Sequence, residues 1–251
     1  MIEKRVEYEK MFAVEQELWW YRILHQRVLA AIEMNFSSKD IVILDAGCGT
    51  GGLLHALRTH GYGQVAGFDG SADAVSFCRQ RGLDVVQHNL TQIENFVPSS
   101  MLDVIVCDDV FCYLTDEEIQ NVVQCFKKWL KPNGIFISNN NAFSVFYGTH
   151  DIAIGSKRRF VKNDLVAIAQ GVGWKVTFAT YWSFILSPLI LVIRRWQALK
   201  LKWGWEQPES IVSDVTLPPK WVNLLLYQMV QFEQRFLPKM PFGSSLFTVM
   251  R

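Results

Sequence analysis

The chain has 251 residues, of which 50% are hydrophobic, 13% aromatic and 20% charged. This composition excludes an intrinsically disordered chain, and the length suits one α/β domain with a substantial insertion. The formal net charge is +1, from 25 basic and 24 acidic residues, so the overall positive field that gathers nucleic acid is missing and no nucleic-acid partner is expected.

The N-terminal segment is charged and lacks the apolar stretch of a signal peptide. Within it, Tyr21, Leu24, Val28 and Ile32 recur at helical spacing. This spacing predicts an amphipathic helix that packs over a sheet or closes a pocket. We interpret residues 1–36 as an N-terminal helical cap.

Residues 37–181 alternate short apolar runs with helical patterns, which is typical of βαβ units and a parallel sheet. The expected strands are residues 41–45, 64–68, 84–88, 103–107, 135–138 and 174–181. The expected helices are residues 51–60, 71–81, 115–130 and 164–170. A capping box of Thr115 and Glu118 marks the start of the third of these helices, and Pro132-Asn133-Gly134 predicts a turn after it.

The remaining residues form an insertion at 182–240, with two helical stretches, and a final strand within 241–251. A strand added after a long excursion is consistent with an antiparallel edge on a parallel sheet. The sequence therefore predicts a Rossmann-like α/β fold. It has a seven-stranded, mostly parallel sheet with an antiparallel last strand, an N-terminal helix and a helical insertion before the last strand.

One apolar run, residues 178–193, is shorter than the roughly 20 apolar residues that a membrane-spanning helix needs. We interpret it first as a buried or lid helix. The alternative is an interfacial helix on a membrane, favoured by the tryptophans and basic residues within and after the run. Peripheral membrane contact through residues 178–205 is therefore a second hypothesis.

The five cysteines show no paired metal-ligand spacing, so we expect free thiols in a reducing compartment and no bound metal. They are Cys48, Cys78, Cys107, Cys112 and Cys125. We expect a cytoplasmic protein that is a monomer or a homodimer.

The strongest signal in the chain is a glycine-rich loop, Asp45-Ala46-Gly47-Cys48-Gly49-Thr50-Gly51, between a predicted strand and a predicted helix. Glycine allows a tight turn and a close approach to a ligand. Dinucleotide sites use G-x-G-x-x-G, whereas this loop has an acid at the strand end and Gly-x-Gly-x-Gly. The difference favours S-adenosylmethionine (SAM) over a pyrophosphate cofactor. Asp69 ends the next strand, where an acid meets ribose hydroxyls, although a turn or cap role is the alternative.

With these motifs, the sequence resembles the class I SAM-dependent methyltransferases. More narrowly, it is similar to a bacterial branch near the quinone-biosynthesis methyltransferases, often found beside natural-product and glycan genes. The segments that carry the resemblance are Trp19-Trp20-Tyr21-Arg22, residues 44–51, Asp103-Val104-Ile105-Val106, Leu130-Lys131-Pro132-Asn133-Gly134, Lys157-Arg158-Arg159-Phe160 and residues 241–246.

The resemblance implies SAM as cofactor and S-adenosylhomocysteine (SAH) as product. The candidate cofactor-binding residues are Tyr21, Arg22, Asp45, Gly47, Cys48, Gly49, Gly51, Asp69, Gly70, Ser71, Asn89, Leu90 and Asp108. The glycines would line methionine and ribose, and Asp69 would hold the ribose. Asn89 stands where the family usually has an aspartate near adenine, and Leu90 would contact the ring. Asp108 would meet the methionine end, whose carboxylate Tyr21 or Arg22 would reach.

The candidate catalytic residues are His150, Tyr113 and Asp151. Relatives often carry Glu-His where this chain has Cys112 and Tyr113, so the family's base is not carried over. His150 follows the fifth predicted strand, and ligands of open α/β sheets bind beyond the carboxyl ends of strands. Histidine suits proton removal near neutral pH, with Asp151 orienting it or an acceptor. The alternative is a solvated loop histidine.

The candidate substrate-binding residues are Tyr147, Arg158 and Arg159, because guanidinium groups pair bidentately with carboxylate or phosphate. A solvated pair at a helix entrance is the alternative. The predicted function is methyl transfer from SAM to an O or N atom of a small-molecule, natural-product acceptor. The alternatives are a lipid-like or lipid-linked acceptor at a membrane surface, and a non-catalytic SAM-binding partner subunit.

Overall fold

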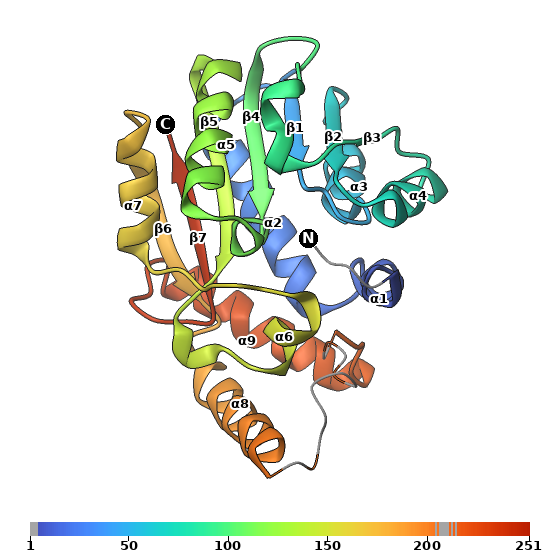
Figure 1. The fold of residues 1–251 in the computed structure, drawn as a ribbon, viewed down its shortest axis with the longest axis vertical. Helices are drawn as coiled ribbons and strands as arrows, with labels where there is room; N and C mark the ends of the chain where they lie inside the picture. Colours follow the sequence, from blue (N-terminus) through green and yellow to red (C-terminus); the bar gives the residue numbers. More distant parts are fainter. Residues whose placement is uncertain (1–4, 204, 206–210, 212, 214) are drawn as a thin grey trace.

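A computed structural model of the chain describes residues 5–203, 205, 211, 213 and 215–251. Among these residues, seven strands form one sheet in the order β3-β2-β1-β4-β5-β7-β6 (Figure 1). The strands are β1 (Ile43–Ala46), β2 (Val65–Asp69), β3 (Val86–Gln87), β4 (Leu102–Asp108), β5 (Leu130–Asn141), β6 (Val176–Trp182) and β7 (Ser245–Met250).

Nine α-helices and three short 3-10 helices are described alongside the sheet. The α-helices are α1 (Arg5–Val14), α2 (Trp19–Asn35), α3 (Gly52–Thr59), α4 (Ala72–Gln80), α5 (Asp116–Trp129), α6 (Thr149–Ile154), α7 (Lys162–Gly171), α8 (Ser187–Lys202) and α9 (Lys220–Phe236). The 3-10 helices are η1 (Leu90–Asn95), η2 (Phe111–Tyr113) and η3 (Ser144–Phe146).

The last strand is antiparallel, as predicted, but it does not lie at an edge. β7 pairs with β5 on one side and with β6 on the other, antiparallel to both, so that Met250 faces Phe136 and Val176. All six residues of β7 are therefore buried. The edge prediction is wrong because chain order does not reveal that the tail inserts between two earlier strands. The edge strands of the sheet are β6 and β3, and β3 is shorter than the strand predicted at residues 84–88.

Helices cover both faces of the sheet, which gives each face its own core. On one face, Val122 and Phe126 of α5 pack with Ile105 of β4. On the other face, α2, α3 and α9 pack against the sheet, with Tyr227 and Val230 of α9 in the cluster. Burying each such side chain contributes about 1.5–3 kcal/mol. Because α9 comes from the predicted insertion, part of that insertion belongs to the layer that covers the sheet.

Hydrogen bonds from nearby and from distant residues satisfy the N-termini of two helices. The capping box of α5 is confirmed: Glu118 N donates to Thr115 Oγ1 at 3.2 Å, and Thr115 N donates to Glu118 Oε2 at 2.7 Å. α2 has no side-chain cap of its own. Its Trp19 N instead donates to Asn223 Oδ1 of α9 at 2.9 Å, so a residue far along the chain satisfies this helix end.

The prediction of one buried helix across residues 178–193 is wrong. Residues 178–182 belong to β6, the backbone turns at Ser183 (φ +63°), and α8 begins at Ser187 with Pro188 in its first turn. An apolar run alone does not distinguish a strand from a helix. Of the helices in the described ranges, none combines the length and the hydropathy needed to cross a bilayer.

Candidate active site

The glycine-rich loop between β1 and α3 forms one wall of a cavity of about 710 Å³. Gly47 has φ +83°, and a Cβ there would lie 2.6 Å from Val110 Cγ2. Gly49 has φ +54°, and a Cβ there would lie 3.0 Å from Met11 Sδ of α1. Both positions combine a left-handed backbone with a close neighbour. The loop therefore needs glycine at both, because a side chain would be strained and would collide with that neighbour.

Asp69, at the end of β2, holds the glycine-rich loop in place through a hydrogen bond. Its Oδ2 accepts from Gly49 N at 2.9 Å, and its Oδ1 accepts from Ser71 N at 2.8 Å. Burial raises the pKa of this carboxyl, opposed by the two backbone hydrogen bonds. A carboxylate has about four acceptor sites, so Asp69 retains acceptor capacity toward the cavity that it lines.

Asn89 and Leu90 line the same cavity as Asp69, and their contact with adenine stays a prediction. Leu90 is buried and begins η1. The side-chain oxygen of Asn89 accepts from Thr91 N at 3.0 Å and so caps this helix. The capping bond uses one of the oxygen's two lone pairs, and the amide N–H groups are available as donors.

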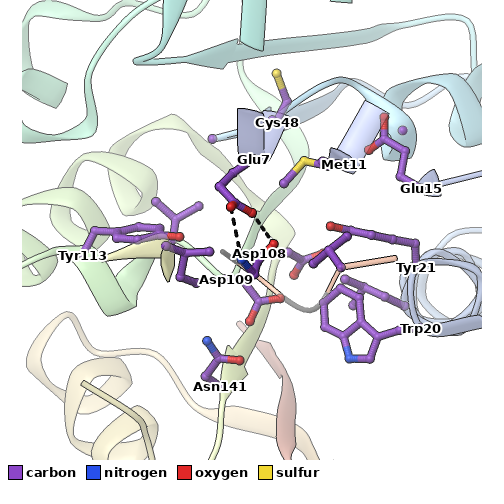
Figure 2. Close-up of a pocket in the computed structure, with 18 of the residues that line it drawn as sticks. Glu7, Met11, Glu15, Trp20, Tyr21, Cys48, Asp108, Asp109, Tyr113 and Asn141 are labelled. Carbon is purple, nitrogen blue, oxygen red and sulfur yellow. Dashed lines mark hydrogen bonds between the residues drawn. The ribbon is translucent and has the colours of Figure 1, made fainter. Parts of the chain in front are cut away.

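Asp108 and Asp109 lie at the carboxyl end of β4, in the centre of Figure 2. Asn139 of β5 holds both: its backbone N donates to Asp108 Oδ1 at 2.7 Å, and its Nδ2 donates to Asp109 Oδ2 at 2.9 Å. Trp182 Nε1 donates to Asn139 Oδ1 at 2.9 Å, which orients the amide. This network directs two carboxyl groups into one cavity.

Asp109 is a candidate functional residue that the sequence interpretation did not select. It has φ +56°, a conformation that non-glycine residues rarely adopt and that is concentrated at functional sites. Its buried Oδ1 has no hydrogen-bond partner within the described residues. Burial raises the pKa of Asp109 to about 6, opposed by the Asn139 hydrogen bond and by the nearby charges of His150 and Arg159. The sequence signal for this site was the pair of adjacent acids Asp108 and Asp109 at the end of β4. The sequence interpretation selected only Asp108.

Residues of α1, together with Ser213 and Val215, form a further wall of the cavity. Glu7 accepts hydrogen bonds from the backbone N of Ser213 at 3.1 Å and from its hydroxyl, as the dashed lines in Figure 2 show. Glu15, after α1, accepts from Thr50 Oγ1 at 2.5 Å and from Arg81 Nη2 at 2.6 Å. Burial raises the pKa of Glu15 to about 7, although Arg81 opposes the shift. These contacts fasten α1 over the glycine-rich loop.

Most of the other predicted cofactor residues also line the cavity. These are Tyr21, Asp45, Cys48, Gly70 and Asp108. Burial raises the pKa of Asp45 and of Tyr21, so both groups favour their neutral forms. Figure 2 places Tyr21 and Trp20 on the α2 side of the cavity and Tyr113 across from them.

Three predicted cofactor residues do not line the cavity, and their contacts with the cofactor stay predictions. A Cβ on Gly51 would lie 2.6 Å from Leu83 Cδ1 and 3.0 Å from Cys78 Sγ of α4, so this glycine allows the loop to pack closely against α4. Ser71 is the N-cap of α4 and accepts from Ala74 N at 3.4 Å. The guanidinium of Arg22 lies 4.0 Å from the ring centroid of Tyr227, where it makes a cation–π contact with α9.

Among the predicted catalytic residues, His150 and Tyr113 line the cavity and Asp151 does not. Asp151 is buried and accepts from Nε and Nη2 of Arg159, both at 2.9 Å, and from Gly148 N at 2.9 Å. The ion pair and the helix cap hold this carboxylate, and its role beside His150 stays a prediction. The charge of His150 acts on Asp109, where it opposes the rise in pKa that burial causes.

The predicted substrate residues separate into different environments. Arg159 borders the cavity, with Nη1 donating to the Ala142 carbonyl at 3.0 Å in addition to its pair with Asp151. Arg158 points outward, pairs with Asp116 and lies over the Phe160 ring at 4.6 Å. Tyr147 is half-exposed beside a smaller cavity. Arg158 and Tyr147 therefore do not line the large cavity, and substrate contacts for all three residues stay predictions.

We expect Gly47→Ala to lower the free energy of unfolding by about 2–4 kcal/mol, because a strained φ and a contact with Val110 add together. The SAH-induced rise in Tm should also be lost. Gly155→Ala is the matched control, since Gly155 has φ +73° with nothing within 4 Å of a Cβ. It should cost about 1–2 kcal/mol. Thermal denaturation with and without SAH measures both, and equal behaviour of the two variants would contradict the steric argument.

Comparison with known proteins gives a similar family over part of the chain and a shared fold. Residues 43–134, from β1 into β5, match the family model described as a methyltransferase domain. A malonyl-[acyl-carrier protein] O-methyltransferase from Halalkalibacterium halodurans is 29% identical over 139 residues, which are 52% of this chain and 51% of that protein. The chain thus spans about half the length of the curated relatives it matches.

Solved structures match a larger part of the chain. A SAM-dependent methyltransferase from Archaeoglobus fulgidus superimposes with a TM-score of 0.58 at 15% identity, over 91% of this chain and 92% of that one. Magnesium protoporphyrin IX methyltransferase from Synechocystis with bound SAH gives a TM-score of 0.52 at 19% identity, over 63% and 75%. The chain has the Rossmann-like methyltransferase fold, and residues 43–134 are the part that matches the methyltransferase-domain model.

Proposed function

We propose that this protein is a SAM-dependent methyltransferase that methylates an O or N atom of a small-molecule acceptor, within the branch near the quinone-biosynthesis enzymes. The observation that carries the proposal is the hydrogen bond from Gly49 N to Asp69 Oδ2, at the wall of a cavity in a methyltransferase domain. It joins the two sequence motifs that would bind the cofactor. The proposed setting is natural-product metabolism in the cytoplasm.

The residues present fit SAM on three counts. Gly47 and Gly49 leave a surface that a Cβ would obstruct, Asp69 offers acceptors to the ribose, and Asn89 with Leu90 would meet adenine. The unpartnered Asp109 Oδ1 supplies an acceptor further along the cavity. A volume of about 710 Å³ lies within the roughly 300–1,000 Å³ of ligand pockets, and we infer that it holds cofactor and acceptor together.

SAM supplies an electrophilic methyl group on a sulfonium, so the protein has to align an acceptor and exclude water. Alignment is worth up to roughly 7–11 kcal/mol in favourable cases. Here α1, fastened by Glu7 and Glu15, would exclude water from one side. On the acceptor side, we place Asn141, Lys157 and Arg159, which line the cavity.

For an acceptor that starts protonated, we propose His150 as the base and Asp109 as the acid that stabilises its charged form. His150 lines the cavity, and its charge acts on Asp109. A carboxylate favours a nearby imidazolium, which is the form that proton removal creates. Tyr113, in the same cavity, is a second candidate for contact with the acceptor.

Calorimetry with SAM, SAH and NAD tests the cofactor, and transfer of a labelled methyl group to candidate acceptors tests the activity. We expect heat with SAM and SAH and none with NAD. Tight NAD binding with no SAH binding would refute the cofactor assignment. SAH binding without transfer to any acceptor in a broad panel would favour the non-catalytic partner subunit, for which the Cys112-Tyr113 departure is the supporting observation.

A second candidate acceptor is lipid-like or lipid-linked. The supporting observation is that Ile190 and Arg194 of α8 line the cavity while other residues of α8 are exposed and apolar. α8 therefore lies between the proposed acceptor site and the outer surface of the molecule.

A further inference from the structure

α8 presents its more apolar face to solvent. Its exposed apolar residues are Leu189, Val192, Ile193, Trp196 and Leu199, with Trp203 directly after the helix. They recur at three- and four-residue intervals and so form one stripe along the helix. Val192 is 67% exposed and Trp196 is 49% exposed. Surface helices of globular proteins normally turn such a stripe toward the core, so this helix has the opposite orientation.

The inward face of the same helix is partly polar. Arg194 Nη1 donates to Gln197 Oε1 at 2.8 Å, and Ile190 and Arg194 line the large cavity. α8 therefore separates the cavity from the outer surface at the lower end of the molecule in Figure 1. The apolar stripe on its outer side is not required for packing within the described chain.

Three exposed tryptophans extend the stripe. The ring centroids of Trp203 and Trp205 lie 4.9 Å apart, and those of Trp196 and Trp205 lie 6.2 Å apart. Each of these side chains is about half-exposed or more. Clustered tryptophans with one apolar and one polar edge are typical of the membrane–water interface.

The charged residues within α8 are all basic. α8 carries Arg194, Arg195, Lys200 and Lys202 and no acidic residue. α9 exposes a second apolar stripe that includes Trp221 and Phe232. The one acid within α9, Glu233, is fully buried. The two helices together therefore expose basic and apolar side chains and no carboxylate.

We propose that α8 is an interfacial helix that docks on an anionic lipid bilayer. Apolar burial and attraction to anionic headgroups act together in such helices. A second copy of the chain fits less well, because a symmetric contact places like patches together and would oppose these basic residues. Combined with the proposed function, docking would place the cavity beside the bilayer, which suits an amphiphilic acceptor with an apolar tail.

Vesicle flotation of the full chain tests the proposal. We expect the protein to float with vesicles of phosphatidylcholine and phosphatidylglycerol in equal amounts, and to float much less with phosphatidylcholine alone. Val192→Ser combined with Trp196→Ser should lower the partition coefficient about 100-fold. Arg195→Ser combined with Lys202→Ser should lower it roughly 30-fold, and added salt should weaken binding of the wild type.

The matched control is Met34→Ser combined with Val97→Ser, since both side chains are 83% exposed and apolar and lie outside α8 and α9. It should float like the wild type. Equal flotation of all variants, or no flotation of the wild type, would overturn the proposal. So would light scattering that shows a wild-type dimer and a monomeric Val192→Ser, Trp196→Ser variant. SAH calorimetry on each variant separates these outcomes from failure of the proposed cofactor site.

Discussion

Asp69→Ala is expected to abolish measurable SAH binding while the protein stays folded. The two oxygens of Asp69 accept from Gly49 N and Ser71 N, at 2.9 Å and 2.8 Å, so its removal leaves both amides without their acceptor and releases the loop. The proposed ribose hydroxyls lose the same acceptor. A hydrogen bond to a charged group contributes about 1.5–3 kcal/mol, so losing two raises the Kd roughly 100-fold or more. Isothermal titration calorimetry measures the change.

Asp69→Asn refines this test. The amide keeps one acceptor oxygen, but its NH₂ group would face a backbone donor, so we expect an intermediate loss of affinity. Asp84→Asn is the control, because Asp84 is exposed and does not line the cavity. It should bind SAH like the wild type. Wild-type affinity in Asp69→Ala would show that the cofactor's sugar lies elsewhere.

Asp109→Asn is expected to lower methyl transfer at least about 100-fold while SAH binding is retained. Loss of a positioned acid–base group typically costs 10²–10⁴-fold in rate. Asparagine keeps the side-chain shape and tolerates the left-handed backbone that Asp109 adopts at φ +56°. Its oxygen can still accept the hydrogen bond from Asn139 Nδ2. The variant therefore removes the charge beside His150 without changing the backbone, and single-turnover transfer measures its effect.

The Asp109→Asn variant should have a larger free energy of unfolding than the wild type at neutral pH. The pKa of Asp109 rises from 3.8 to about 6 in the fold, so the native state holds this proton more tightly than the unfolded state. The group's contribution to stability is largest below pH 3.8 and is lost as the pH rises to about 6. A shift of about two units corresponds to roughly 3 kcal/mol. Asparagine does not titrate, so the advantage of the variant should grow over this range.

Urea denaturation at a series of pH values checks the stability prediction without an acceptor. Asp84→Asn again serves as control, with no comparable gain between pH 4 and pH 7. Unchanged turnover in Asp109→Asn would remove Asp109 from the mechanism. A variant that is no more stable at pH 7 than the wild type would show that burial of this carboxylate is not costly.

The proposed cofactor half of the site rests on sequence signals that are local. A glycine that must adopt positive φ, as at Gly47, and an acid that ends the next strand, as Asp69 does, are properties of short segments. Parallel strands place their carboxyl ends at one edge, so two such segments meet whatever the rest of the chain does. Strand and helix positions followed from hydrophobic periodicity for the same reason.

The arrangement of the proposed acceptor half of the site depends on contacts between segments that are distant in the sequence. Arg158 and Arg159 are adjacent in sequence, yet one pairs with Asp116 at the surface and the other with buried Asp151. Asp109 was not selected, because its role depends on an amide in β5 that is itself held by Trp182 of β6. Sequence spacing does not reveal which of several polar partners a side chain will meet.

The sequence by itself determined the class of fold, the glycine loop and the acid that supports it, because backbone conformation and hydrophobic periodicity are decided over a few residues. Only the tertiary structure decided that β7 inserts between β5 and β6, that Asp109 faces the cavity, and that the apolar stripe of α8 faces outward. Those features depend on which surfaces pack together. Packing is determined by the burial and charge of residues throughout the chain, and not by any short segment.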